Sequence, residues 1–175
     1  MDKRPYIKIN HRKRTEIEFA EAFEQGNEVI FLTIMSQHTR KQIEPLLVKA
    51  KSSRTKINIL TFDPNASNEV IESLQKHLKD SGATTASTKK QIEEAFQEWK
   101  IFENQYPNII EIRKYNSIPT VQGLFVKDKF ISLELMTYVT LPKDRAGAQI
   151  YKDISPKLFD LIYQKYETLW IDAQR

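Results

Sequence analysis

A histidine and an arginine near position 40 offer the chemistry of an anion-binding site. Gln37, His38 and Arg40 come directly after an apolar run and open a helical pattern. A phosphate at that helix start would meet backbone N–H groups and a cation together. The same residues also suit a structural role, because helices commonly begin with a polar capping side chain. Both interpretations stay open at this point.

Further polar residues follow two other predicted strands. Asp63 precedes Pro64, where it could act as a general base or accept a hydrogen bond from a ribose hydroxyl, although Asp-Pro also forms ordinary turns. Arg113 and Tyr115 stand at the end of a later strand. Ligands of open α/β sheets bind at the carboxyl ends of the strands, so these positions are the candidates for a site.

Several catalytic motifs are absent from the sequence. The chain has no cysteine, which excludes a thiolate nucleophile and a disulfide framework and fits a reducing compartment. His11 and His77 have no partner at metal-ligand spacing, and the four glycines form no phosphate-binding loop. We therefore expect neither a metal nor a cofactor.

The apolar pattern predicts the elements that would position these residues. Near-continuous apolar runs at 28–35 and 56–62 are typical of strands covered on both faces, and a further strand is predicted at 109–115. A hairpin is predicted over 118–134, turning at Lys127-Asp128. Helical spacing and capping residues predict helices over 16–25, from 39, over 67–79, from 88 and from 155. The expected fold class is α/β, a mixed and mostly parallel sheet with helices on both faces.

Irregular structure is expected in two stretches and at one glycine. Residues 83–89 have the composition of a connector, and 138–151 that of a long surface loop, with Pro142, Gly147 and mixed charges. Gly123 stands alone inside a predicted strand, where a bulge is expected and close approach of a backbone or ligand is the alternative. Two aromatic stripes at helical spacing are expected to pack in the core, namely Phe96, Trp99 and Phe102, and Tyr163, Tyr166 and Trp170.

Positive charge is concentrated at the N-terminus. The net charge is +4, and we expect residues 1–14 to form a basic arm and 15–175 a single domain. The basic residues of the arm are Lys3, Arg4, Lys8, Arg12, Lys13 and Arg14. Such an arm could make weak, salt-dependent contacts with nucleic acid, or it could be a solvated terminus. No apolar run approaches the roughly 20 residues of a membrane-spanning helix, and no leader pattern is present, so we expect no membrane contact and a cytoplasmic location.

Four features together resemble the phospholipase D-like superfamily. They are the hairpin, the preceding Ile112-Arg113-Lys114-Tyr115 strand, the strand end at 60–64 and the C-terminal helix, within a span of about 15–173. Active members carry a His-x-Lys-x4-Asp motif, in which the histidine is the covalent nucleophile and the lysine holds the phosphate. The resemblance implies that family's fold.

The motif itself is not found in this sequence. If Asp128 is the motif aspartate, Val121 and Gly123 stand at the histidine and lysine positions, and a shift of one residue gives Thr120 and Gln122. Neither alignment supplies a nucleophile with its lysine, so the family's two-step phosphodiesterase chemistry is not expected. The resemblance also implies a homodimer across a two-fold axis, with a polar cleft at the strand ends.

The sequence thus favours a non-catalytic sensor or regulatory domain that binds a small anionic ligand, such as a nucleotide or phosphometabolite, or a protein partner. The candidate ligand-binding residues are Gln37, His38, Arg40, Asp63, Arg113, Tyr115, Thr120 and Gln122. The first alternative is a nucleic-acid-binding module that uses the basic arm. The second is a phosphoester hydrolase of a different mechanism that uses His38 and Asp63.

Overall fold

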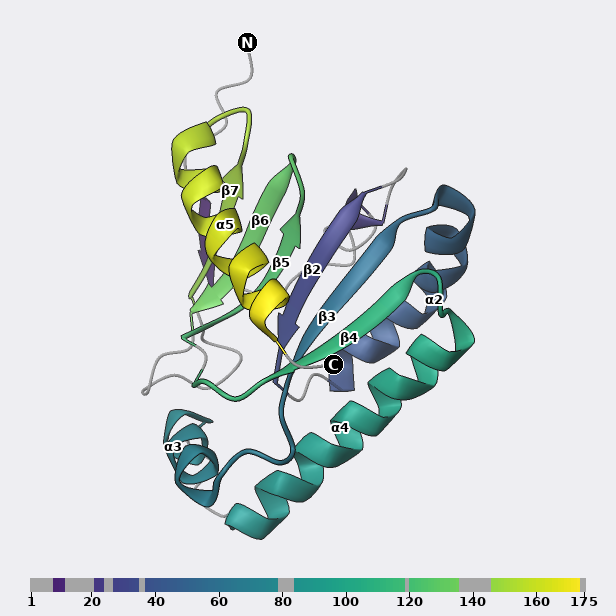
Figure 1. Cartoon of the computed structure of the whole chain (residues 1–175). Coiled ribbons are helices and arrows are strands. Elements are labelled where there is room, and N and C mark those ends of the chain that lie inside the picture. Colours follow the sequence, from purple (N-terminus) through teal and green to yellow (C-terminus); the bar gives the residue numbers. More distant parts are fainter. Residues whose placement is uncertain are drawn as a thin grey trace.

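A mixed seven-stranded sheet forms the centre of the part of the chain that the computed structural model describes, residues 8–11, 21–23, 27–34, 37–78, 84–118, 120–135 and 146–173. The strands lie in the order β1-β7-β6-β5-β2-β3-β4 (Figure 1). Their bounds are β1 Lys8–His11, β2 Glu28–Thr33, β3 Lys56–Phe62, β4 Ile110–Tyr115, β5 Val121–Val126, β6 Phe130–Leu135 and β7 Ala146–Tyr151.

Helices cover both faces of this sheet. Their bounds are α2 Gln37–Ser53, α3 Asn68–Leu78, α4 Thr85–Gln105 and α5 Pro156–Asp172. The α2 and α4 helices lie on one face, and α5 crosses the other (Figure 1). Successive side chains of a strand point to opposite faces, so Val29 and Phe31 pack toward α2 and α4, while Ile30 and Leu32 pack toward α5. Burial on both sides explains the continuous apolar run of β2.

The predicted α/β class with a mixed sheet is confirmed, but the prediction that the sheet is mostly parallel is wrong. Among the strands of the described ranges, only β2–β3 and β3–β4 pair in parallel. The pairs β2–β5, β5–β6, β6–β7 and β1–β7 are antiparallel. The antiparallel half is larger than expected because β1 and β7 carry weak strand signals in the sequence.

The strand β7 lies where a surface loop was predicted. Its sequence, Ala-Gly-Ala-Gln-Ile-Tyr, is poor in β-branched and aromatic residues, so its local preference for a strand is low. Pairing with β6 supplies the missing stability, with Ile131 opposite Ile150 and Leu133 opposite Ala148. On its other edge β7 pairs with β1, so residues 8–11, expected in the basic arm, belong to the sheet.

The start of α4 also differs from the prediction of a connector over 83–89. Thr84 caps the helix, since its side chain accepts a hydrogen bond from Ser87 N (3.1 Å) while Thr84 N donates to Ser87 Oγ (2.9 Å). Thr88, predicted as the cap, is instead buried within the helix, where Gln75 of α3 donates to its hydroxyl (2.8 Å). The capping box was missed because serine replaces the usual glutamate at its third position.

Several other predictions are confirmed. The strands β2, β3 and β4, the helix α3 and the hairpin of β5 and β6 lie where the pattern placed them, and α5 begins with Pro156. Asp128 takes a positive φ of 60° in the hairpin turn. Both aromatic stripes pack on the core, with Trp99 fully buried on one face of the sheet and Tyr163 on the other. The helix predicted at 16–25 falls mainly outside the described residues.

None of the helices in the described ranges is long and apolar enough to cross a membrane.

Two neighbouring residues of α2 provide a matched test of this packing. Leu47 is fully buried against the sheet, and Val48 is 67% exposed. We expect Leu47→Ala to lower the free energy of unfolding by about 2–5 kcal/mol, because it leaves a cavity in a close-packed core. Val48→Ala should change it by less than about 0.5 kcal/mol. Chemical denaturation of both variants measures the difference, and equal losses would contradict the burial of this helix face.

Candidate functional site

The connection between β4 and β5 crosses the carboxyl ends of the parallel strands. β4 is an edge strand beside β3, whereas β5 pairs with the far side of β2. The chain that follows Tyr115 must therefore pass the ends of β3 and β2 before it enters β5 at Val121 (Figure 1). In open α/β sheets, this kind of change in strand order is where ligands bind.

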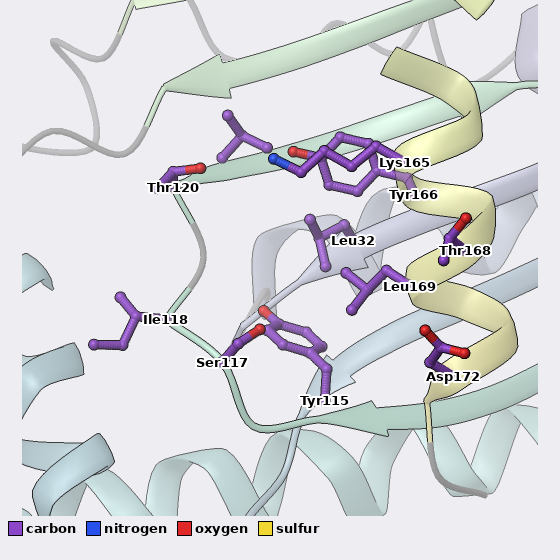
Figure 2. Close-up of a pocket in the computed structure, with 11 residues that line it drawn as sticks. Leu32, Tyr115, Ser117, Ile118, Thr120, Lys165, Tyr166, Thr168, Leu169 and Asp172 are labelled. Atoms are coloured by element: carbon purple, nitrogen blue, oxygen red, sulfur yellow. The ribbon is translucent and has the colours of Figure 1, made fainter. Parts of the chain in front are cut away.

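A cleft of about 380 Å³ lies between this connection and the last turns of α5 (Figure 2). We call it the switch-point cleft. Its apolar lining residues are Leu32, Ile118, Val121 and Leu169. Its polar lining residues are Tyr115, Ser117, Thr120, Lys165, Tyr166, Thr168 and Asp172. A smaller hollow of about 190 Å³ adjoins it and shares Tyr115, Ser117, Leu169 and Asp172.

Tyr115 forms a fixed wall between the two hollows. Its hydroxyl donates to the carbonyl oxygen of Thr33 (3.1 Å), and its ring meets Phe62 edge-on at 5.5 Å. Burial raises the pKa of Tyr115 well above its ordinary value, and the neighbouring Tyr166 raises it further. The phenol is therefore neutral and acts as a hydrogen-bond donor within the fold, which does not suit a general base.

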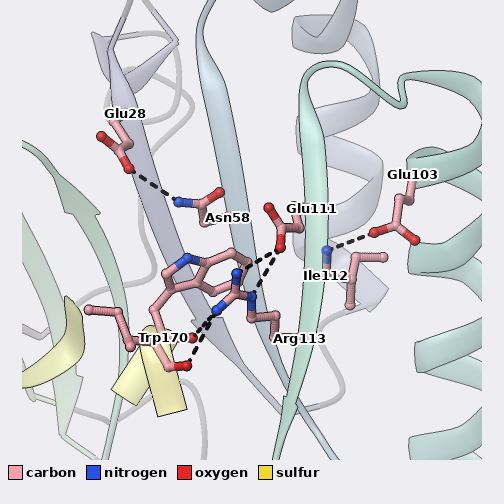
Figure 3. Close-up of polar contacts among 8 residues, drawn as sticks. Glu28, Asn58, Glu103, Glu111, Ile112, Arg113 and Trp170 are labelled. Atoms are coloured by element: carbon pink, nitrogen blue, oxygen red, sulfur yellow. Dashed lines mark hydrogen bonds and ion pairs between the residues drawn. The ribbon is translucent and has the colours of Figure 1, made fainter. Parts of the chain in front are cut away.

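Arg113 fastens the end of α5 to the edge strand β4 (Figure 3). Its Nη1 donates to the carbonyl oxygens of Trp170 (2.8 Å) and Ile171 (3.4 Å), and its guanidinium lies 4.4 Å from the centre of the Trp170 ring. Its Nε and Nη2 bind one oxygen of Glu111, at 3.0 and 2.9 Å. The last carbonyls of a helix have no partner within it, so these contacts stabilise the helix end. Arg113 thereby positions the cleft residue Leu169 without lining the cleft.

The outer edge of β4 is covered as well. Glu103 of α4 accepts a hydrogen bond from the backbone N–H of Ile112 (2.9 Å), a group that would otherwise face solvent on the free edge (Figure 3). This contact ties α4 to β4 in the same way that Arg113 ties α5 to it. The strand that carries Tyr115 into the cleft is thus held from both faces of the sheet.

Gly123 makes room for an aromatic ring. A Cβ atom there would lie 2.5 Å from Cε2 of Phe125, and the Phe125 ring packs against Tyr166 with 4.2 Å between ring centres. The predicted bulge is wrong, because Gly123 pairs regularly with Leu32 on one side and Leu133 on the other. The predicted alternative was close approach of a backbone or ligand, whereas the group that approaches Gly123 is the Phe125 side chain.

The structure brings together two of the predicted site residues. Tyr115 and Thr120 both line the switch-point cleft, and Asp63 lines the adjoining hollow. Oδ1 of Asp63 accepts the backbone N–H of Asn65 (2.9 Å), the contact of an ordinary turn. Gln122 lies on β5 and lines neither hollow.

The remaining three predicted residues belong to the first turn of α2. Gln37, His38 and Arg40 lie in the helix that follows β2, as expected. Their side chains fall outside the described part of the chain, so their part in an anion site stays a prediction. Within the described residues, no group of three or more His, Cys, Asp or Glu side chains is arranged to hold a metal ion.

The site residues that sequence reasoning missed lie mainly on α5. Ser117, Lys165, Thr168 and Asp172 line the switch-point cleft, and three of these four come from the C-terminal helix. One signal was present, because Lys165 has no acidic residue three or four positions away and so lacks the usual helical ion pair. The packing of α5 across the sheet, which turns these residues toward the strand ends, has no local signature.

No protein-family model matches the sequence, and no curated protein matches it. Several solved structures do match it, by their fold. TrmBL2, an archaeal chromatin protein described with a novel mode of DNA binding, aligns with a TM-score of 0.56 at 13% identity, over 99% of this chain and 55% of that one. Phosphatidylserine synthase of Haemophilus influenzae Rd KW20 aligns at 0.51 and 15% identity, over 87% of this chain and 34% of that one. NucT from Helicobacter pylori aligns at 0.51 and 10% identity, over 96% and 98% of the two chains.

These likenesses show the fold, which is phospholipase D-like, as the resemblance in sequence implied. The chain spans about half the length of TrmBL2 and a third of the synthase.

The contact at Gly123 predicts a specific loss of stability. We expect Gly123→Ala to lower the free energy of unfolding by about 1–3 kcal/mol, because the new methyl group overlaps the Phe125 ring. Adding Phe125→Leu should remove the overlap. The free energy of unfolding of the double variant should therefore fall by less than the sum of the decreases in the two single variants. Denaturant titration of the four proteins measures this coupling, and simple additivity would contradict the close approach.

The Arg113 contacts predict a local loosening of α5. We expect Arg113→Met to cost about 1.5–3 kcal/mol, since hydrogen bonds to a charged donor are lost at two carbonyls. Hydrogen exchange should increase most at 169–173, the end of the helix. Lys157→Met, at the exposed start of the same helix, is the control and should leave that exchange unchanged. Uniform exchange changes along α5 would argue against a local fastening role.

Proposed function

We propose that the chain is a non-catalytic phospholipase D-like domain that binds a small anionic ligand in the switch-point cleft, in a regulatory role. One observation carries the proposal. The cleft lies where β5 begins, and it is lined by both residues that the two alignments place at the family's nucleophilic histidine, Val121 if Asp128 is the motif aspartate and Thr120 after a shift of one residue. A valine cannot form the covalent intermediate of the family's reaction, so a site at this position suits binding and not phosphodiester cleavage.

The chemistry of the lining supports an anionic group near Lys165. Among the described residues that line the cleft, Lys165 is the one cation, and its side chain extends toward Thr120 (Figure 2). The hydroxyls of Ser117, Thr120 and Thr168 are further donors at the same opening. An ammonium group in a cleft that also offers hydroxyl donors suits a phosphate or carboxylate oxygen.

The size and shape of the cleft fit a small molecule. Its volume of about 380 Å³ falls in the range of ligand pockets, and its apolar residues form a surface on which a ring or aliphatic part could rest. Because α5 forms one wall, a ligand would add contacts between that helix and the β4–β5 connection. Ligand binding would thereby stabilise the end of α5, which gives regulation a physical basis.

Nucleic-acid binding is a second candidate function. It is favoured by the concentration of basic residues before position 15 and by the likeness in fold to TrmBL2, which binds DNA. Steep salt dependence of DNA binding, lost on deletion of residues 1–7, would support it. The homodimer that the resemblance implies is likewise a proposal, and light scattering tests it.

A thermal-shift comparison tests the proposed anion site. We expect AMP or glucose 6-phosphate to raise the melting temperature, because a ligand that binds only the folded state stabilises it. Adenosine and glucose, which lack the phosphate, should raise it less. Lys165→Met should weaken the binding of the phosphorylated probe about tenfold, the value of one charged hydrogen bond.

The control variant is Lys157→Met, which removes an exposed lysine of the same helix far from the cleft. It should bind the probes as the wild type does. Equal shifts with and without the phosphate, or equal loss in both variants, would contradict an anion site at Lys165. Phosphodiester turnover that survives purification to homogeneity would contradict the non-catalytic assignment.

A further inference from the structure

Two opposite charges of α5 face the switch-point cleft. Lys165 and Asp172 both line it and stand seven residues apart on the helix. Seven residues make two helical turns, so the two lie on the same side of α5, separated by a rise of about 10 Å. Figure 2 shows Lys165 at the Thr120 end of the cleft and Asp172 at the end near Tyr115.

Neither charge is paired with an opposite charge within the described part of the chain, although Nζ of Lys165 lies 6.0 Å from the centre of the Tyr166 ring. The neighbours of Lys165 at three and four positions are Leu161, Ile162, Thr168 and Leu169, none of them charged. No ion pair is formed by Lys165 or by Asp172 with any residue that the structure describes. The two positions are about 10 Å apart along the helix axis, and the described residues show no ion pair between them.

The position of Asp172 is unfavourable for the helix itself. It occupies the last turn of α5, where the helix dipole favours cations, and that turn has no basic residue. Asp63 adds a second carboxylate, since it lines the adjoining hollow together with Asp172. Lys114 lines the same hollow, so its charge offsets one of the two carboxylates and leaves the hollow net negative. Arg113, the other cation on β4, is bound to Glu111 and to the helix carbonyls. This end of the cleft is therefore suited to a cationic group.

The space between the two charges suits a chain with polar and apolar parts. The hydroxyls of Ser117, Thr120 and Thr168 can bind amide groups, and Leu32 and Leu169 offer apolar contact. An extended peptide spans about 3.3–3.6 Å per residue, so a tripeptide covers about 10 Å between its ends. Its terminal carboxylate and ammonium would then reach opposite ends of the cleft.

We infer that the ligand of the switch-point cleft is a zwitterion, with its anionic group at Lys165 and its ammonium group at Asp172, about 10 Å apart along α5. Short peptides with both termini free are the chemical class that fits this spacing. The inference rests on the proposed function, which places an anionic ligand in this cleft, and adds the requirement for a positive charge at its other end.

Calorimetric titration with trialanine and its capped forms tests the requirement for both charges. Trialanine should bind the wild-type protein, while N-acetyl-trialanine, which lacks the ammonium, and trialanine amide, which lacks the carboxylate, should each bind at least tenfold more weakly. Asp172→Asn should abolish the preference for the free ammonium only. Lys165→Met should abolish the preference for the free carboxylate only.

The controls are Asp153→Asn and Lys157→Met, which change exposed charges at the opposite end of α5 and should leave both preferences intact. Equal binding of trialanine and its capped forms would overturn the inference. Binding of glucose 6-phosphate without any binding of trialanine would overturn it too, while leaving the proposed anion site in place. Absence of binding by every probe would contradict both.

Discussion

β5 must join the sheet on the far side of β2, because β3 already occupies the near side and β4 lies beyond it. That constraint carries the chain across the carboxyl ends of two parallel strands and leaves an opening at the point where strand order changes. The two buried faces of β2 fix its pairing register. A shift of the strand by one residue would move each set of apolar side chains to the opposite face of the sheet. The position of the switch-point cleft therefore follows from the strand order, and the side chains determine its lining.

The second wall of the cleft depends on Arg113. By binding the last carbonyls of α5, this residue holds the helix against β4 and aims Lys165, Thr168 and Asp172 at the strand ends. Arg113 was predicted from the sequence to bind the ligand, but its contacts hold in place the helix that forms one wall of the cleft. Gly123 likewise serves packing, because the space that a side chain would need there is taken by the Phe125 ring.

The sequence predicted the central strands, the hairpin and α5 because their apolar patterns follow directly from burial. It did not predict β7, whose stability comes from pairing with β6, nor the start of α4, where serine replaces the expected glutamate. Of the site, it anticipated Tyr115 and Thr120, which adjoin the β4–β5 connection. The α5 residues escaped prediction because their place depends on a contact between distant segments, Arg113 with the helix end.

The most direct test of a binding site at the change in strand order is an NMR titration of backbone amides with glucose 6-phosphate and with trialanine. If the site is as described, the signals that shift will be those of the β4–β5 connection, 116–120, and of the last two turns of α5, 165–172. The amides on the exposed face of α4 should not respond. Shifts confined to other surfaces, or none at 116–120 with either probe, would contradict the account.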